Sequence, residues 1–114
     1  MRLAYILGMI LFIIHMRVPD GKRKELSQTI TSLISSIRME NGCGRCDFFN
    51  DMKDENILYM LEEWKTEENF DAHRQSECFK VLRGAMHLLQ EPWKEISFKI
   101  LFPPNNRLGR HMKE

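Results

Sequence analysis

The fold is decided by two apolar stretches, ILFIIHMRV at residues 10–18 and ILYML at residues 57–61. Successive side chains of a β-strand point to opposite faces, so a strand that is apolar at nearly every position must be covered on both sides. His15 and Arg17 are the only polar residues of the first stretch. The two stretches are therefore predicted to form the central strands of one sheet.

An amphipathic helix and a hairpin are predicted between these two strands. After a turn at Pro19-Asp20-Gly21, apolar residues recur at helical spacing from Leu26 to Ile37, and Asn41-Gly42 follows as a helix terminator. A polar turn at residues 51–56 then joins the stretch at 57–61 to a more polar strand at residues 44–50. Its polarity places that strand at an edge of the sheet.

Two shorter helices and a last strand complete the pattern. Thr66 and Ser76 are suited to cap helices that bury Phe70 and Phe79, and residues 96–102 alternate as a strand before two prolines. Right-handed crossovers then place the first and third strands in the centre. The predicted fold class is α+β: a ferredoxin-like four-stranded antiparallel sheet, in the order β-α-β-β-α-α-β, with its helices on one face.

Helices on one face leave the other face of this sheet, with Leu11, Ile13, Tyr59 and Leu61, without cover. Monomeric proteins rarely expose a contiguous apolar patch of that kind. A second copy of the same sheet is the simplest cover. We therefore expect a homodimer that encloses an apolar pocket.

The composition is that of one globular domain. The chain has 114 residues, of which 43% are hydrophobic and 29% are charged. Its 17 Lys and Arg against 16 Asp and Glu give a formal charge of +1, so no basic surface that would attract nucleic acid is expected. Three cysteines do not suit a disulfide framework, which favours a reducing, cytoplasmic location.

The N-terminus has a second interpretation. Residues 3–14 are almost continuously apolar behind Arg2, as in a signal peptide, but they are too short to span a bilayer, and no small-residue cleavage site follows. The run continues instead into a turn, as a strand does, so no stable membrane insertion is expected. Met9 is an alternative start. We assign residues 1–8 to an N-terminal extension, 9–102 to the domain and 103–114 to a polar tail.

A set of motifs runs through the hairpin and the helices after it: Glu40-Asn41-Gly42-Cys43, Arg45-Cys46-Asp47-Phe48-Phe49, Asp54-Glu55-Asn56, Glu62-Glu63-Trp64, Phe70, Ala72-His73, Ser76 and Phe79. In type and spacing these residues resemble the antibiotic biosynthesis monooxygenase (ABM) family, quinol monooxygenases of the dimeric α/β barrel superfamily. The resemblance extends over residues 9–102 and is more specific for the family than for a substrate. It implies that the homodimer is a dimeric α/β barrel with a small aromatic substrate in its pocket. It also implies oxygenation of a quinol, phenol or anthrone, with molecular oxygen as co-substrate and no metal or flavin cofactor.

An oxygenase without a cofactor must make its substrate the electron donor, by deprotonating it in a dry pocket. On the resemblance, the candidate catalytic residues are His15 and His73 as alternative bases, because imidazole titrates near neutral pH, with Trp64 as an aromatic wall. Arg17 is a candidate partner for a developing oxyanion. The candidate substrate-binding residues are Arg17, Tyr59, Leu11, Ile13 and Leu61.

Each candidate also has a structural interpretation. Trp64 is suited to fill the core against Phe70, and Tyr59 is more typical of a core residue than of a catalyst. His73 is suited to hydrogen-bond a strand end. His15 interrupts an apolar strand and needs a partner or water there, which favours a functional role.

The Cys43-Gly44-Arg45-Cys46 run has the spacing of a redox or zinc half-site. A redox dithiol places its first thiolate at a helix start, whereas this pair leads into a strand, where positions three apart are expected to point to opposite faces. A zinc site needs two further ligands, and only Cys78 and scattered histidines are available. No metal site is therefore predicted.

Two other functions compete with the quinol monooxygenase interpretation. Haem-degrading relatives use a histidine on the last helix, a tryptophan one helix earlier and an asparagine on the first strand, and by spacing those places hold Arg83, His73 and His15. The missing ligand histidine argues against haem, although His87 lies one turn further along. The third interpretation is a dimer that binds an apolar ligand without catalysis, which the sequence does not exclude.

Overall fold

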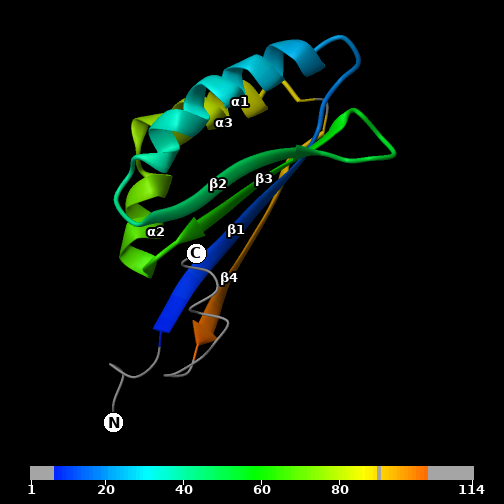
Figure 1. The fold of residues 1–114 in the computed structure, drawn as a ribbon. Coiled ribbons are helices and arrows are strands. Elements are labelled where there is room, and N and C mark those ends of the chain that lie inside the picture. Colours follow the sequence, from blue (N-terminus) through cyan, green and yellow to red (C-terminus); the bar gives the residue numbers. More distant parts are fainter. Residues whose placement is uncertain (1–6, 90, 103–114) are drawn as a thin grey trace.

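The computed structural model describes residues 7–89 and 91–102 and shows a four-stranded antiparallel sheet with three helices on one face (Figure 1). From one edge of the sheet to the other, the strands lie in the order β2-β3-β1-β4. The predicted α+β fold is confirmed, with the first and third strands in the centre and the second at an edge. The elements are β1 (Leu7–Arg17), α1 (Arg23–Arg38), β2 (Cys43–Asn50), β3 (Ile57–Trp64), α2 (Glu67–Arg74), α3 (Glu77–Met86) and β4 (Lys94–Phe102).

The first strand is longer than the sequence predicted. It begins at Leu7, which pairs with Phe102 of β4, and not at Ile10. Leu7 and Gly8 thus belong to the sheet, although the sequence analysis assigned them to an extension. Residues 1–6 and the predicted tail at 103–114 lie outside the described residues. Within the described part, none of the three helices is both long and apolar enough to cross a bilayer.

The two short helices begin where the sequence predicted. The hydroxyl of Thr66 accepts a hydrogen bond from the backbone N–H of Asn69 (3.0 Å) at the start of α2. The hydroxyl of Ser76 accepts one from the backbone N–H of Phe79 (3.2 Å) at the start of α3. Each cap satisfies an N–H group that has no partner inside the helix, so both predicted N-caps are confirmed.

The hydrophobic core lies between the sheet and the helix layer. The even-numbered residues of β1 and β3 point into it, as the two-residue period of a strand requires. The ring of Phe12 lies 4.9 Å from that of Phe70 and 6.2 Å from that of Phe79, so β1, α2 and α3 meet there. The largest apolar side chains that are fully buried are Trp64, Phe12, Phe79, Ile14, Met16, Ile30, Ile37, Leu58, Met60, Leu82 and Met86.

Gly42 makes the tight connection from α1 to β2. Its φ of +81° lies in the left-handed region, and a Cβ on it would lie 2.2 Å from Cγ and Oδ1 of Asn69. Asn69 is held in place, because its Oδ1 accepts a hydrogen bond from the Thr66 hydroxyl (2.7 Å) at the cap of α2. A glycine is therefore needed here for both backbone conformation and space.

We predict that Gly42→Ala destabilises the protein more than Gly21→Ala. Gly21 has nearly the same φ, +82°, but a Cβ there would meet nothing within 4 Å. Gly21→Ala should therefore lower the free energy of unfolding only by the strain of an alanine in the left-handed region, about 1–2 kcal/mol. Gly42→Ala adds the overlap with Asn69. Chemical denaturation measures both free energies of unfolding, and equal losses would show that Asn69 gives way without cost.

Candidate active site

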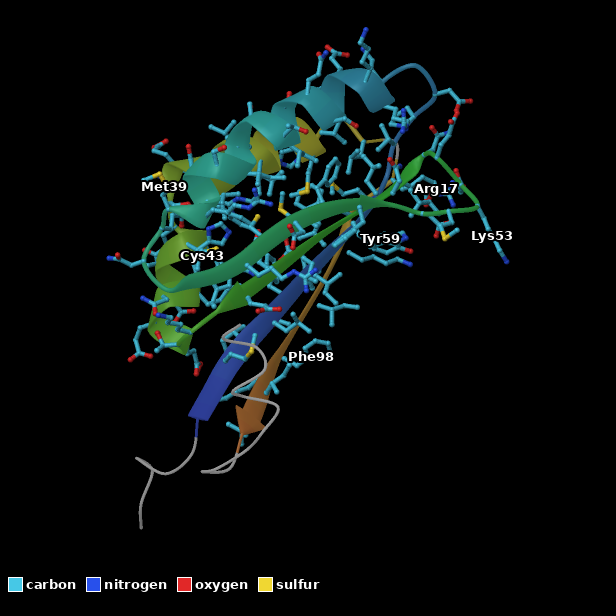
Figure 2. The ribbon with its side chains drawn as sticks, viewed as in Figure 1. Arg17, Met39, Cys43, Lys53, Tyr59 and Phe98 are labelled. Carbon is cyan, nitrogen blue, oxygen red and sulfur yellow. The ribbon has the colours of Figure 1, made fainter. Side chains whose placement is uncertain are left out.

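The sheet face opposite to the helices is uncovered by any described element; we call it the open face. It is largely apolar, and at the β2 edge it carries the ion-paired residues Arg45, Asp47 and Glu63. It presents the odd-numbered residues from Met9 to Arg17 in β1 and from Ile57 to Glu63 in β3, which are half-buried, together with larger side chains from the edge strands. Phe49 is 43% exposed, Ile96 is 52% exposed and Phe98 is 47% exposed. Figure 2 shows Tyr59 and Phe98 pointing away from the helices. The structure thus places the predicted face where the sequence did, with Leu11, Ile13, Tyr59 and Leu61.

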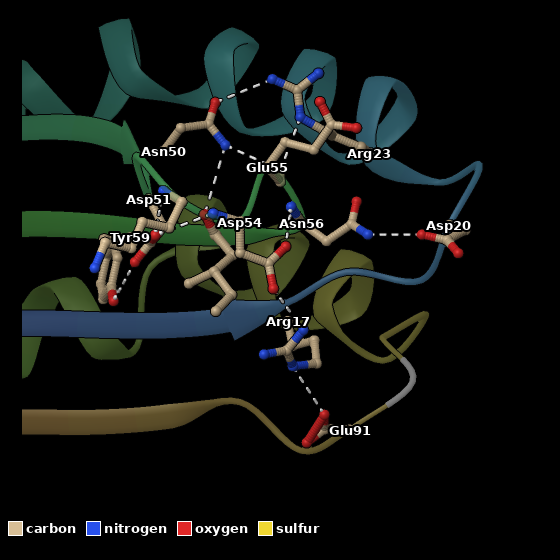
Figure 3. Close-up of polar contacts among 12 residues, drawn as sticks. Arg17, Asp20, Arg23, Asn50, Asp51, Asp54, Glu55, Asn56, Tyr59 and Glu91 are labelled. Carbon is tan, nitrogen blue, oxygen red and sulfur yellow. Dashed lines mark hydrogen bonds and ion pairs between the residues drawn. The ribbon is translucent and has the colours of Figure 1, made fainter.

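His15 and Tyr59 lie next to each other on the open face. They are opposite each other in the β1–β3 ladder, and their ring centroids are 5.2 Å apart in an edge-to-face arrangement. The Tyr59 hydroxyl also lies 3.5 Å from Oδ2 of Asp51, in the turn between β2 and β3 (Figure 3). The imidazole of His15 and the phenol of Tyr59 therefore lie side by side on this face, and both groups can donate or accept a hydrogen bond.

Arg17 lies at the end of β1, two residues beyond His15. Its Nη1 is 3.0 Å from Oδ2 of Asp54 and its Nε is 3.1 Å from Oε1 of Glu91 (Figure 3). The hydrogen bond from the backbone N–H of Asn56 and the one from Arg17 lower the pKa of Asp54, so this carboxylate stays ionised. Arg17 thus joins β1 to two turns, and a substrate oxyanion would compete with two carboxylates for it.

Trp64 and His73 lie on the other side of the sheet, inside the core. Both side chains are buried, and their rings stack with centroids 4.5 Å apart. Trp64 Nε1 donates a hydrogen bond to Oε1 of Glu62 (2.9 Å). His73 Nδ1 lies 2.9 Å from Oε1 of Glu40, and its Nε2 lies 3.0 Å from Oε1 of Glu62. We call Glu40, Glu62, Trp64 and His73 the buried polar cluster.

The two carboxylates determine the charge of His73. Burial alone lowers the pKa of an imidazole, but the contacts with Glu62 and Glu40 outweigh it, so the pKa of His73 is raised above its ordinary value of 6.5. His73 therefore stays protonated over a wider pH range than a free imidazole. An enclosed imidazolium cannot take a proton from a molecule on the open face.

The candidate residues thus separate into two groups. His15, Arg17, Tyr59 and the three aliphatic candidates share the open face, whereas His73 and Trp64 lie behind the sheet and cannot line the same pocket. Glu62 was not predicted to be a partner of His73, although its position between Met60 and Trp64 in the strand indicates that its side chain points inward.

The two cysteines of the Cys43–Cys46 run point to the same side of the sheet, so the prediction that they face opposite ways is wrong. Cys43 is opposite Trp64 and Cys46 is opposite Glu62, because a bulge between Cys43 and Arg45 adds one residue to β2. Both residues line an open surface pocket of about 350 Å³ beside β2. Burial, with the charge of Glu62, raises the pKa of Cys43 to about 11 and also raises that of Cys46. Both are therefore thiols at neutral pH, which does not suit a redox dithiol.

The residues considered for metal or haem do not gather into a site. Within residues 7–89 and 91–102, no three or more His, Cys, Asp or Glu side chains are arranged to hold a metal ion. Arg83 is exposed on α3, with its guanidinium 5.1 Å from the ring centroid of Phe79. His87 is exposed at the end of α3, and its ring lies 5.4 Å from that of Trp93. Both belong to the helix layer and not to the open face.

We predict that Trp64→Phe destabilises the protein by about 1–3 kcal/mol, because it removes the hydrogen bond to Oε1 of the buried Glu62, which then keeps only its contact with His73 Nε2. Trp93→Phe is the matched control. It removes a hydrogen bond of the same kind, from Trp93 Nε1 to Oε2 of Glu95 (2.8 Å), at an exposed place where water replaces it. Thermal and chemical denaturation compare the two variants. A loss in Trp93→Phe as large as in Trp64→Phe would refute a special role for the buried bond.

Comparison with known proteins agrees with this fold. The chain matches the family "Antibiotic biosynthesis monooxygenase" over residues 9–85. It is 33% identical over 86 residues to the Bacillus subtilis (strain 168) protein "Putative monooxygenase YcnE", a match that covers 74% of this chain and 90% of that protein.

Solved structures show the same architecture. A conserved protein from Methanosarcina mazei Go1 is 28% identical with a TM-score of 0.75, over 81% of this chain and 91% of that one. A "Putative antibiotic biosynthesis monooxygenase from Nitrosomonas europaea" has a TM-score of 0.77 at 20% identity, over 85% of this chain and 94% of that one, a likeness that shows the fold alone. The family match over residues 9–85, together with the relative at 33% identity, decides the assignment. This chain belongs to the antibiotic biosynthesis monooxygenase family.

Proposed function

We propose that this protein is a monooxygenase for an electron-rich aromatic compound of the quinol, phenol or anthrone class, with molecular oxygen as co-substrate and no metal or flavin. The observation that carries the proposal is the His15–Tyr59 pair, whose rings lie 5.2 Å apart on an apolar sheet face. Membership of the family supports the reaction type. The substrate class rests on the chemistry that such a face can perform.

The reaction needs a pocket from which water is excluded. The open face of one chain can form only one side of such a pocket. We propose that two copies pack with their open faces toward each other and enclose the pocket between them. The support is the exposure of Phe49, Ile96 and Phe98, which surround half-buried residues on the same face. A symmetric pair would bury all of these side chains at once.

The proposed chemistry balances without an external reductant. For an anthrone, a base removes a proton from the activated CH₂ carbon, and the resulting anion passes one electron to O₂. The substrate radical and superoxide combine to a peroxide anion, which takes the proton back from the base. The resulting hydroperoxide loses water and leaves a C=O group. One oxygen atom enters the substrate and the other leaves as water, so the substrate supplies all the electrons.

Within this scheme His15 is the base that accepts the substrate proton, and Tyr59 donates a hydrogen bond to the anion that forms. The apolar side chains around them exclude water, which strengthens both interactions. Arg17 mainly holds the two turns at this end of the sheet. His73 and Trp64, which the sequence analysis also proposed as catalytic, have structural roles in this proposal because they are buried behind the sheet.

We predict that Phe98→Glu converts the dimer to a monomer, whereas Val81→Glu does not. The two side chains are almost equally exposed in the single chain, at 47% and 49%, but Phe98 lies on the open face and Val81 on α3. Burial of a charge in an apolar interface costs several kcal/mol. Sedimentation at micromolar concentration measures the association. A wild-type protein that is already monomeric would refute the dimer, and so would equal effects of the two variants.

We predict that His15→Gln lowers turnover about 10²- to 10⁴-fold, the usual contribution of a general base. The measurement is oxygen uptake with a panel of naphthoquinols and anthrones. His87→Gln is the control, because His87 lies on the helix layer and should leave turnover unchanged.

Three outcomes separate this function from its alternatives. Unchanged turnover in His15→Gln would remove His15 as the base. A Soret shift on titration with haem would favour the haem interpretation. An absence of turnover with the whole panel, combined with a higher Tm in the presence of the same compounds, would favour a binding protein without catalysis.

A further inference from the structure

The attachment of α2 depends on few side chains. Of its eight residues only Phe70 and His73 are buried, whereas α1 buries four and α3 buries three. A helix of this length is not stable by itself in water, so its tertiary contacts decide whether it forms. Arg74 adds an ion pair to Glu95 (3.1 Å), and its guanidinium lies over the rings of Phe12, Phe70 and Phe79 at the edge of the core. One of the two buried anchors of α2 is thus an ionisable group.

His73 connects α2 to two other parts of the chain. Glu62 belongs to β3, and Glu40 follows the end of α1. Both carboxylates have one buried oxygen, Oε2, without a hydrogen-bond partner among the described residues. The same holds for His73 Nε2, whose 3.0 Å contact with Glu62 is an ion-pair contact and not an aligned hydrogen bond. An imidazolium offers two N–H donors and a positive charge to this pair, whereas a neutral imidazole offers one donor and no charge. Loss of the proton would leave the fully buried carboxylate of Glu62 and the partly buried one of Glu40 without a counter-charge.

The other titratable groups around His73 do not replace its charge. Cys43 and Cys46 on β2 are thiols with raised pKa values, and so is Cys78 on α3, where burial and the charge of Glu40 act in the same direction. Arg74, its neighbour on α2, is held by Glu95. The charge of the buried polar cluster is therefore set by the protonation of His73.

We propose that His73 is a proton-operated latch for α2: its imidazolium holds α2 against β3 and the end of α1, and loss of the proton releases α2 while the sheet, α1 and α3 stay folded. Local opening of a single element below the free energy of global unfolding is a general property of folded proteins. The inference concerns the helix side of the sheet and does not depend on the proposed function.

The direction in which pH changes the stability of docked α2 follows from the direction of the pKa shift of His73. The pKa of His73 in the folded protein is raised above the ordinary value of 6.5, which is the value for the unfolded chain. The stabilisation is therefore fully present below that ordinary value and is lost as the pH rises through the raised value. In this window the closed state of α2 should weaken about tenfold per pH unit, because one proton is released.

Native-state hydrogen exchange from about pH 6 to about pH 9, a range that brackets the ordinary imidazole pKa, tests the latch. After correction for intrinsic exchange, the amides of α2 should lose protection as the pH rises while those of α3 keep theirs. An NMR titration of the His73 ring should give the same midpoint. Protection of α2 that does not change with pH, or that falls together with that of α3, would overturn the proposal.

Glu40→Gln sharpens the test without removing His73. It takes away one of the two carboxylates, so the pKa of His73 should fall toward its ordinary value, and the loss of α2 protection should be smaller and complete at a lower pH. Glu68→Gln is the matched control, because Glu68 is an exposed residue in the first turn of α2. If both variants shift the transition equally, net charge and not the contact with His73 controls α2.

Discussion

The structure depends on one constraint: β1 and β3 are apolar on both faces, and the three helices can cover only one. The face under the helices becomes the hydrophobic core. The other face keeps its apolar side chains at the surface of the single chain, with Phe98 and Ile96 about half exposed. The same constraint that builds the core therefore creates the surface on which His15 and Tyr59 meet.

The core itself is not purely apolar. At the end of β3, Glu62 points inward and is fully buried, in a place where a charge is costly unless it is paired. Trp64 and His73 supply that pairing, which explains why an aromatic N–H and an ionisable helix residue stand so close together in a hydrophobic layer. Residues that look catalytic in the sequence thus acquire a structural explanation.

Much of the fold could be predicted, because residue types at helix starts and the spacing of apolar residues along the chain determine it locally. The caps at Thr66 and Ser76 need only the type of residue at a helix start, and the central position of β1 and β3 needs only their apolar character. The direction of Cys43 relative to Cys46 could not be predicted, since it depends on a bulge that exists only when β2 pairs with β3. The position of Glu40 beside His73 likewise needs α1 and α2 to be docked.

By itself, the sequence determined the order of the elements, the two central strands and the residues that share a face with His15. These properties follow from a period of two along each strand and from the connections between elements. Only the tertiary structure decided that His73 lies behind the sheet from His15, in contact with Glu40 and Glu62. The physical reason is that periodicity groups residues by face, whereas the docking of helices decides which distant side chains meet in the interior and share a proton.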